Sequence, residues 1–265
     1  MIATANIRRL GEVDRIPVPS AEVFTKYVRR RRPVIITGAL EDWPARRWSP
    51  EYLKARFGDH VIPVAPIRDG NVIYGAEFGV RYDEITFRDW LDGLLAGSPP
   101  PYYAMFHVNE VLPALMNDLR VPEFCPSAPW SVTRFWMSPS DTGSAMHQDL
   151  PDNLLAQIIG RKRLVLVPPA DSWRMYRHPL TSHLPQCSRV DAERPDFTRF
   201  PRFARARQLH VELAAGELLY LPRLWWHQAR SLEFSVTVNH WWATGWRYLA
   251  VRLAVAYQRL RQIRW

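Results

Sequence analysis

The feature that most constrains the fold is a succession of short β-type segments in the second half of the chain. From Tyr102 onward, runs rich in β-branched and aromatic side chains are separated by Gly, Pro or Asp. This pattern favours a sandwich or barrel over a parallel α/β sheet. The candidate strands are Tyr102–Val108, Trp130–Met137, Ser144–Asp149, Asn153–Ile159, Lys162–Val167, Leu209–Leu213, Glu217–Leu221, His227–Ser231 and Phe234–Trp241.

The composition is compatible with a packed β core. Hydrophobic residues make up 47% and charged residues 23% of the chain, which argues against wholesale disorder. The 12 Trp, 10 Tyr and 11 Phe suit such a core, because flat rings pack well on pleated sheets. We therefore expect a mainly β protein with one substantial hydrophobic core.

Helices are expected on either side of the β region. Ser20–Arg29, Ser49–Gly58 and Thr86–Leu95 each begin with a Ser or Thr that suits an N-cap, and Pro33–Gly38 reads as a short buried strand. The tail Trp246–Trp265 is amphipathic, with apolar residues near one face and arginines on the other. Such a helix either folds back on the barrel or pairs with a second subunit, which makes a homodimer a reasonable expectation.

The chain contains no internal repeat and no Gly/Ser-rich linker. We therefore expect a single domain over residues 1–265. Residues 1–100 would form a lead-in of helices and strands, residues 101–243 the β-barrel core, and residues 244–265 a C-terminal helix.

Several features indicate where the protein works and with what. The first residues lack the apolar run of a signal peptide, and no segment approaches the roughly 20 apolar residues that span a bilayer. The two cysteines, Cys125 and Cys187, lie in dissimilar contexts, so we do not expect a disulfide framework. We expect the protein to work in the reducing cytoplasm. The formal net charge of +9 suits an acidic partner, either a peptide or RNA.

The first chemical signal is the pair His147 and Asp149. Residues two apart on a strand point to the same face, so an imidazole and a carboxylate can reach one metal ion. A second histidine from a distant strand would complete the two-His-one-carboxylate triad of non-haem Fe(II) oxygenases, which leaves positions open for co-substrate and O₂.

Two histidines compete for the third ligand position. His227 begins a candidate strand after the turn signals of residues 216–222, whereas His240 lies inside a later candidate strand. Strand alternation places Asn239 and Trp241 on one face and His240 on the other. This alternation favours His227 as the third ligand.

A further signal is Lys162, which opens the return strand of a hairpin that turns at Gly160 and Arg161. Leu164 and Leu166 share its predicted face. A lysine among inward apolar neighbours is costly to bury unless it meets an anion, for which the distal carboxylate of 2-oxoglutarate is a candidate. Spacing alone also allows a solvated turn of three basic residues.

Taken together, these residues resemble the JmjC-type protein hydroxylases, and most of all the factor-inhibiting-HIF type of asparaginyl hydroxylase. The resemblance extends over roughly residues 15–245. The residues that carry it are Arg32–Gly38, Trp43-Pro44, His147, Asp149, Asn153, Ala156–Ile158, Gly160, Lys162-Arg163, Pro168-Pro169, Ser188–Pro201, Trp225–His227 and Val238-Asn239.

The resemblance implies a double-stranded β-helix, the jelly-roll of cupin and JmjC proteins. It also implies that His147, Asp149 and His227 hold Fe(II), and that Lys162 holds the distal carboxylate of 2-oxoglutarate. O₂ would be the third reactant. Other positions that match the co-substrate pocket are Ser144, Asn153, Asn239, Trp241 and either Tyr102 or Tyr103, of which Tyr103 is preferred.

The expected activity is hydroxylation of an amino-acid side chain in a peptide or protein, including a peptide natural product. One departure concerns the substrate: the chain has Gln186-Cys187 where the asparaginyl hydroxylase has an Arg-Gln pair that grips the substrate backbone. Two alternatives remain open at this point. One is an oxygenase that acts on RNA or a ribosomal protein, and the other is a cupin scaffold that binds without catalysis.

Overall fold

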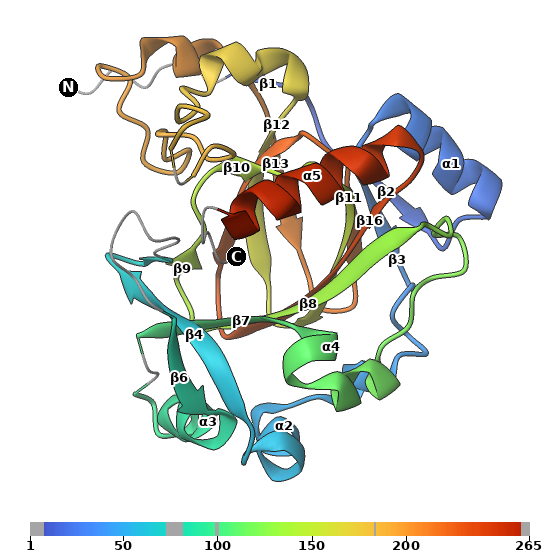
Figure 1. Cartoon of the computed structure of the whole chain (residues 1–265), viewed down its shortest axis with the longest axis vertical. Helices are drawn as coiled ribbons and strands as arrows, with labels where there is room; N and C mark the ends of the chain where they lie inside the picture. Colours follow the sequence, from blue (N-terminus) through green and yellow to red (C-terminus); the bar gives the residue numbers. More distant parts are fainter. Residues whose placement is uncertain (1–7, 73–81, 99–100, 183, 261–265) are drawn as a thin grey trace.

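In a computed structural model, the chain forms two packed β layers with helices on the outside (Figure 1). The structure describes residues 8–72, 82–98, 101–182 and 184–260. The strands within these ranges join into one hydrogen-bonded sheet that folds back on itself. This architecture confirms the predicted jelly-roll, the double-stranded β-helix of cupin proteins.

The first layer is mostly antiparallel and runs from β2 to β6. In spatial order it contains β2 (Asp14–Pro17), β3 (Val34–Thr37), β14 (Leu218–Leu221), β11 (Asp152–Ile159), β16 (Ser235–Ala243), β8 (Trp130–Ser138), β7 (Tyr102–His107), β4 (Val61–Arg68) and β6 (Asp83–Thr86).

The second layer carries two of the expected metal ligands. Its strands are β1 (Arg8–Arg9), β13 (Arg207–Leu213), β12 (Lys162–Val167), β15 (Trp226–Ser231), β10 (His147–Gln148), β9 (Thr142–Gly143) and β5 (Asn71–Val72). In this layer β10 and β15 run antiparallel, and His147 stands directly opposite His227.

The described helices begin where the sequence predicts, except for the short helix Val108–Val111, which was not predicted. They are α1 (Ala21–Arg30), α2 (Pro50–Phe57), α3 (Phe87–Leu95), α4 (Val108–Val111) and α5 (Trp246–Leu260), with 3-10 turns at Pro44–Arg47, Pro113–Asp118, Pro169–Arg174 and Pro201–Arg205. The side chains of Ser20, Ser49 and Thr86 accept from backbone N–H groups in the first turns of α1, α2 and α3. Each cap satisfies one backbone donor that the helix itself leaves unpaired.

Hydrophobic clusters hold the layers and helices together, and three of them are large. One lies between the two layers and contains leucines of β11, β12, β13 and β14. A larger cluster packs α1, α2 and α3 against the outer face of the first layer. The third covers the outer face of the second layer with the segments around Met175 and Phe203. The inner face of the sandwich is therefore the place where side chains from both layers meet.

Two expectations need correction. The predicted strand Ser144–Asp149 is much shorter, because only His147 and Gln148 pair with β15. Strand β4 was not predicted, because Pro63 and Pro66 interrupt its pattern, and proline removes a donor from the ladder.

Helix α5 lies next to β16 and presents a mixed surface. Val251 is buried, whereas Leu249 and Leu253 point to solvent. Residues 261–265, the end of the predicted helix, lie outside the described residues, and a homodimer through α5 stays a prediction. Within the described residues, no helix is both long enough and apolar enough to cross a membrane.

Candidate metal centre

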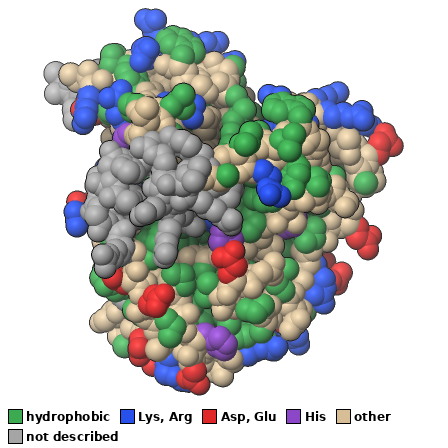
Figure 2. Space-filling model, in the orientation of Figure 1, with side chains coloured by type: hydrophobic (Ala, Val, Ile, Leu, Met, Phe, Trp, Pro, Cys, Tyr) green, Lys and Arg blue, Asp and Glu red, His purple; other side chains and the backbone are tan. Residues whose placement is uncertain are grey.

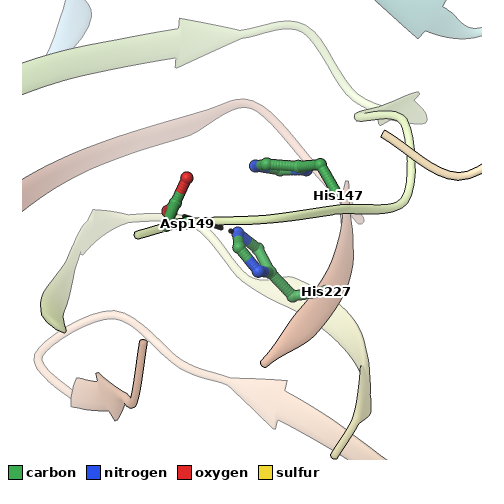
Figure 3. Close-up of side chains that lie close together, drawn as sticks. All are labelled: His147, Asp149 and His227. Carbon is green, nitrogen blue, oxygen red and sulfur yellow. Dashed lines mark ion pairs between the residues drawn. The ribbon is translucent and has the colours of Figure 1, made fainter. Parts of the chain in front are cut away.

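Three side chains converge at one end of the space between the layers: one from β10, one from the residue just after it, and one from β15. His147, Asp149 and His227 point toward one another (Figure 3), and one ligand atom of each lies within 4.8 Å of the others. The two imidazole rings have their centroids 4.1 Å apart, and His227 Nε2 is 3.7 Å from Asp149 Oδ2. Two atoms that each bind a metal at about 2.1 Å can be no more than about 4.2 Å apart, so this pair suits a shared ion.

The hydrogen bonds of both histidines fix which nitrogen faces the centre. His147 Nδ1 lies 2.8 Å from the carbonyl oxygen of Ala145, and His227 Nδ1 lies 3.0 Å from that of Trp225. A carbonyl oxygen only accepts, so each Nδ1 must donate a proton. In a neutral ring, Nε2 then keeps its lone pair, which is the form that binds a metal.

The local environment keeps His227 neutral. Burial, and to a lesser degree the neighbouring His147 ring, lowers the pKa of His227 to about 4, although Asp149 acts in the opposite direction. At neutral pH His227 is therefore an uncharged imidazole. Two histidine nitrogens and one carboxylate fit the donor set of non-haem Fe(II) sites.

Hydrogen bonds from two other segments orient Asp149. Trp241 on β16 donates from Nε1 to Asp149 Oδ2 at 3.0 Å, and the backbone N–H of Leu224 donates to the carbonyl oxygen of Asp149 at 2.7 Å. The sequence predicts that Trp241 lies beside the site, but it does not predict the hydrogen bond from Trp241 to the Asp149 carboxylate. The other candidate histidine, His240, faces away and bonds to Thr133 at 3.3 Å.

Lys162 lies on the inner face, as its strand pattern predicted. It stands opposite Ser231 on β15, and His227 stands opposite Leu166 four residues further along the same pair of strands. Only 5% of Lys162 is exposed, and burial lowers the pKa of its ammonium group to about 7. Among the residues that the structure describes, no carboxylate pairs with it.

The expected pocket residues fall on the same inner face. Asn239 donates to Asn153 at 3.0 Å, and Trp241 stands opposite Asn153 across β11 and β16. Ser144 donates to no described group but accepts from the N–H of Ala229 at 3.0 Å.

The two tyrosine candidates separate clearly. Tyr103 is buried, and its ring lies 5.8 Å from that of Trp136, whereas Tyr102 packs with the outer helical cluster. Burial raises the pKa of Tyr103, so its hydroxyl stays protonated at neutral pH.

Sequence reasoning missed Trp136, whose ring contacts the rings of both Tyr103 and Trp241. The ring centroids of Trp136 and Trp241 are 6.0 Å apart in a T-shaped contact. The strand alternation of residues 132–136 points Trp136 inward, but the sequence alone does not show which distant rings it meets.

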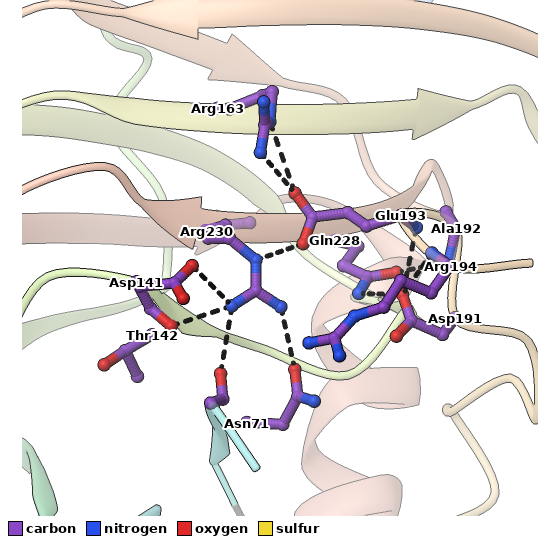
Figure 4. Close-up of polar contacts among 12 residues, drawn as sticks. Asn71, Asp141, Thr142, Arg163, Asp191, Ala192, Glu193, Arg194, Gln228 and Arg230 are labelled. Carbon is purple, nitrogen blue, oxygen red and sulfur yellow. Dashed lines mark hydrogen bonds and ion pairs between the residues drawn. The ribbon is translucent and has the colours of Figure 1, made fainter.

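A second polar network fixes the strand that carries His227. Arg230, three residues along β15, is 5% exposed and bonds to Glu193, to the carbonyl oxygens of Gly70 and Asp141, and to the side chain of Asn71 (Figure 4). One guanidinium group therefore ties four segments of the second layer together. This network lies beside the metal centre and does not belong to it.

A jelly-roll with two imidazoles and a carboxylate gathered at one end is the arrangement of a cupin-type domain with a candidate metal site. The chain belongs to the cupin-like domain family, whose sequence profile matches residues 20–247. This membership confirms the resemblance to JmjC-type oxygenases that the motifs indicated.

Relatives with known names show how broad this family is. The chain is 32% identical to lysine-specific demethylase 8 of Danio rerio over 250 residues, which is 88% of this chain and 58% of that protein. It is 28% identical to the human tRNA wybutosine-synthesizing protein 5 over 256 residues (86% of this chain, 78% of that protein). It is also 28% identical to the human bifunctional peptidase and (3S)-lysyl hydroxylase over 269 residues (87% and 83%).

The chain spans a little over half the length of several relatives that it matches at about 30% identity. None of the three relatives described above is an asparaginyl hydroxylase by name. The comparisons therefore establish the family. They do not show the narrower likeness to asparaginyl hydroxylases.

Proposed function

We propose that the chain is an Fe(II)- and 2-oxoglutarate-dependent dioxygenase that hydroxylates an amino-acid side chain in a peptide or protein. The observation that carries this proposal is the convergence of two imidazole Nε2 atoms and one carboxylate on a single point. When bound, Fe(II), 2-oxoglutarate and O₂ supply the oxidation that inserts one oxygen atom into a C–H bond and yields succinate and CO₂.

His147, Asp149 and His227 would hold the iron from one side. Three protein ligands leave the opposite positions for the keto acid and O₂. The Trp241 indole would keep Asp149 turned toward the metal through its hydrogen bond.

Lys162 would bind the distal carboxylate of 2-oxoglutarate. Its ammonium group is buried on the inner face. Burying a charge costs less free energy when the charge pairs with an anion. Ser144, Tyr103, Asn153 and Asn239 would line the same pocket and orient the co-substrate.

The presence of Asp149 favours hydroxylation over halogenation. A Gly or Ala at this position would leave room for a halide ligand, and the carboxylate occupies that place. Demethylation would be the same reaction at the carbon of an N-methyl group. One relative is a demethylase by name, so the proposal includes this reaction.

The substrate class rests on the relatives and on the charge of the chain. One relative is a lysyl hydroxylase by name, which supports an amino-acid side chain in a peptide or protein as the target. RNA is the second candidate, because another relative is a tRNA wybutosine-synthesizing protein and the net charge is +9. On the face in Figure 2, however, acidic and hydrophobic side chains interrupt the Lys and Arg side chains, which form no continuous track for a phosphate backbone.

The test is Fe(II)-dependent conversion of 2-oxoglutarate to succinate in air, followed by mass spectrometry of candidate peptides for one added oxygen atom. The wild-type protein should form succinate, and His227→Ala should lower the rate at least about a hundredfold because one ligand is lost. Equal rates in the two proteins would refute the assignment of an iron oxygenase. Oxygen added to RNA but to no peptide would favour the second candidate.

A further inference from the structure

A surface outside the metal centre carries arginines that the proposed chemistry does not use. Two 3-10 turns, Pro169–Arg174 and Pro201–Arg205, contact each other on the outer face of the second layer. They are the yellow and orange coils at the top of Figure 1, and Figure 2 shows several Lys and Arg side chains in that part of the molecule. The metal centre lies on the inner face of the same layer, so this surface is separate from it.

Guanidinium groups lie over aromatic rings on this surface. The guanidinium carbon of Arg174 is 4.3 Å from the centroid of the Trp173 ring. That of Arg202 is 6.0 Å from the centroid of Trp173 and 4.4 Å from the centroid of Tyr176. Trp173 is nevertheless 55% exposed, a high value for a residue type that is mostly buried. Stacking holds each guanidinium flat against a ring and leaves N–H groups at its edge free to donate.

The same arrangement continues on the other side of Tyr176. The Tyr176 and Phe200 rings have their centroids 5.0 Å apart, and the guanidinium carbon of Arg199 is 5.2 Å from the centroid of Phe200. Arg189 donates from Nε to the carbonyl oxygen of Tyr176 at 3.3 Å. We call this group of side chains the arginine–aromatic surface. Its residues are Trp173, Arg174, Tyr176, Arg189, Arg199 and Arg202.

Most of the positive charge on the arginine–aromatic surface is unpaired. Arg189, Arg199 and Arg202 are exposed, and none of them forms an ion pair with a carboxylate among the residues that the structure describes. The fourth arginine, Arg174, pairs with a buried aspartate. The nearby Asp196 carboxylate accepts from the backbone N–H of Arg199 at 3.0 Å. Like charges gathered on one surface repel each other, so an anion that binds there relieves the repulsion.

We propose that the arginine–aromatic surface binds an acidic segment of a partner protein, in which Asp and Glu side chains follow one another closely. Each stacked guanidinium presents N–H donors in one plane, and two parallel N–H···O bonds fit one carboxylate. Three unpaired guanidinium groups therefore match a segment with several carboxylates. The exposed side of Trp173 would pack against the apolar parts of the same segment.

Two observations favour an acidic protein segment over single-stranded RNA. Proteins that bind RNA through aromatic side chains offer open ring faces on which the bases stack. Guanidinium groups already lie over Trp173 and Tyr176, at 4.3 and 4.4 Å from the ring centroids. The arginines also gather around two short turns and do not follow the line of a phosphate backbone.

Binding of two labelled peptides to the full chain tests the proposal. One peptide is a Glu-Ser repeat, the other has Gln in place of every Glu, and fluorescence anisotropy gives both dissociation constants. We expect the acidic peptide to bind at least about tenfold more tightly, because several exposed ion pairs add up. Added NaCl should weaken its binding, because salt screens exposed charges. Equal affinities for the two peptides would overturn the proposal.

Variants locate the preference on the arginine–aromatic surface. Arg199→Gln/Arg202→Gln should bring the ratio of the two affinities close to one. Arg202→Lys keeps the charge without the planar group and should retain only part of the preference. The control Arg29→Gln/Arg30→Gln removes the same charge from exposed positions on α1 and should keep the wild-type ratio. Equal losses in the two double variants would mean that the peptide responds only to net charge, which would overturn the assignment.

Two further measurements complete the test. Urea unfolding should give the same midpoint for the wild type and both double variants, because the substituted side chains are exposed. Labelled oligouridylate provides the RNA arm: if it binds more tightly than the acidic peptide and loses affinity in Arg199→Gln/Arg202→Gln, the proposal is overturned. Neither Fe(II) nor 2-oxoglutarate is added, so failure here leaves the proposed oxygenase activity untouched.

Discussion

At the scale of single residues, the centre depends on hydrogen bonds that set the state of each ligand. Backbone carbonyls two residues before His147 and His227 take the Nδ1 protons, so both Nε2 atoms face inward. The Trp241 indole orients Asp149 in the same way, through a hydrogen bond to its carboxylate. Outer hydrogen bonds of this kind raise metal affinity because they prevent ligands from turning away.

Trp241→Phe should therefore weaken metal binding while the ring packing is retained. We expect roughly a tenfold loss of Co(II) affinity, measured by titration of the visible Co(II) absorption. Trp48→Phe is the matched control, because it removes an indole hydrogen bond of 2.9 Å to Asp118 in the outer cluster. If both variants bound Co(II) as the wild type does, the hydrogen bond to Asp149 would have no role in holding the metal.

The buried Lys162 predicts a pH dependence of co-substrate affinity. Its pKa of about 7 means that the ammonium form dominates at pH 6 and is mostly lost at pH 8. Because 2-oxoglutarate would bind the charged form, its Kd should rise about tenfold between these values. Calorimetry on metal-loaded protein measures the change. Lys162→Arg, which stays charged, should give a flat profile, and an equally flat wild-type profile would contradict this role.

At the scale of elements, β15 is the critical strand. It pairs with β10, β12 and β9, so it brings His227 to His147 and aligns both with Lys162. Arg230 on the same strand fixes the position of β15 relative to Glu193, Asp141 and Asn71. The precision of the centre therefore depends on a strand that is held on both sides.

Arg230→Met should destabilise the protein strongly. It leaves the largely buried Glu193 without its closest cation, and breaking such a pair typically costs about 3–5 kcal/mol of unfolding free energy. Urea unfolding measures this loss. Arg161→Met removes two ion pairs of an exposed arginine and should have a much smaller effect. Similar losses in both variants would show that burial of the Arg230 network does not matter.

At the scale of the whole molecule, the fold places chemistry and packing on different faces of the same strands. The outer face of β8 packs with the helices through Phe135 and Met137, while Arg134 and Trp136 on its inner face contact Trp241 beside the centre. The N-terminal helices thus stabilise the layer without entering the site. A metal bound at the proposed centre would join two strands of the second layer and should stabilise the entire fold.

Added Co(II) should raise the unfolding free energy of the whole domain. At a metal concentration one hundred times the Kd, the expected gain is about 2.7 kcal/mol, because only the folded chain assembles the three ligands. Urea unfolding with and without Co(II) measures it, and His227→Ala should show almost no gain. An equal gain in that variant would place the metal elsewhere.

The sequence predicts the local parts of this molecule well. Strand β12 and the capped helices α2 and α3 have the expected bounds within one or two residues, because periodicity and capping are properties of adjacent residues. The candidate ligands were also found from short-range patterns. The contacts of Arg134 with His107 and Trp241 were not found, because strand pairing, rather than spacing along the chain, brings those residues together.

The most direct test of the central claim is the weak visible charge-transfer band that forms when protein, Fe(II) and 2-oxoglutarate are mixed without oxygen. We predict this band for the wild-type protein and its absence from His147→Ala, Asp149→Ala and His227→Ala at the same concentrations. Lys162→Met should require much more 2-oxoglutarate to reach the same intensity. A wild-type protein that never develops the band, or a band that persists in all three ligand variants, would contradict the account.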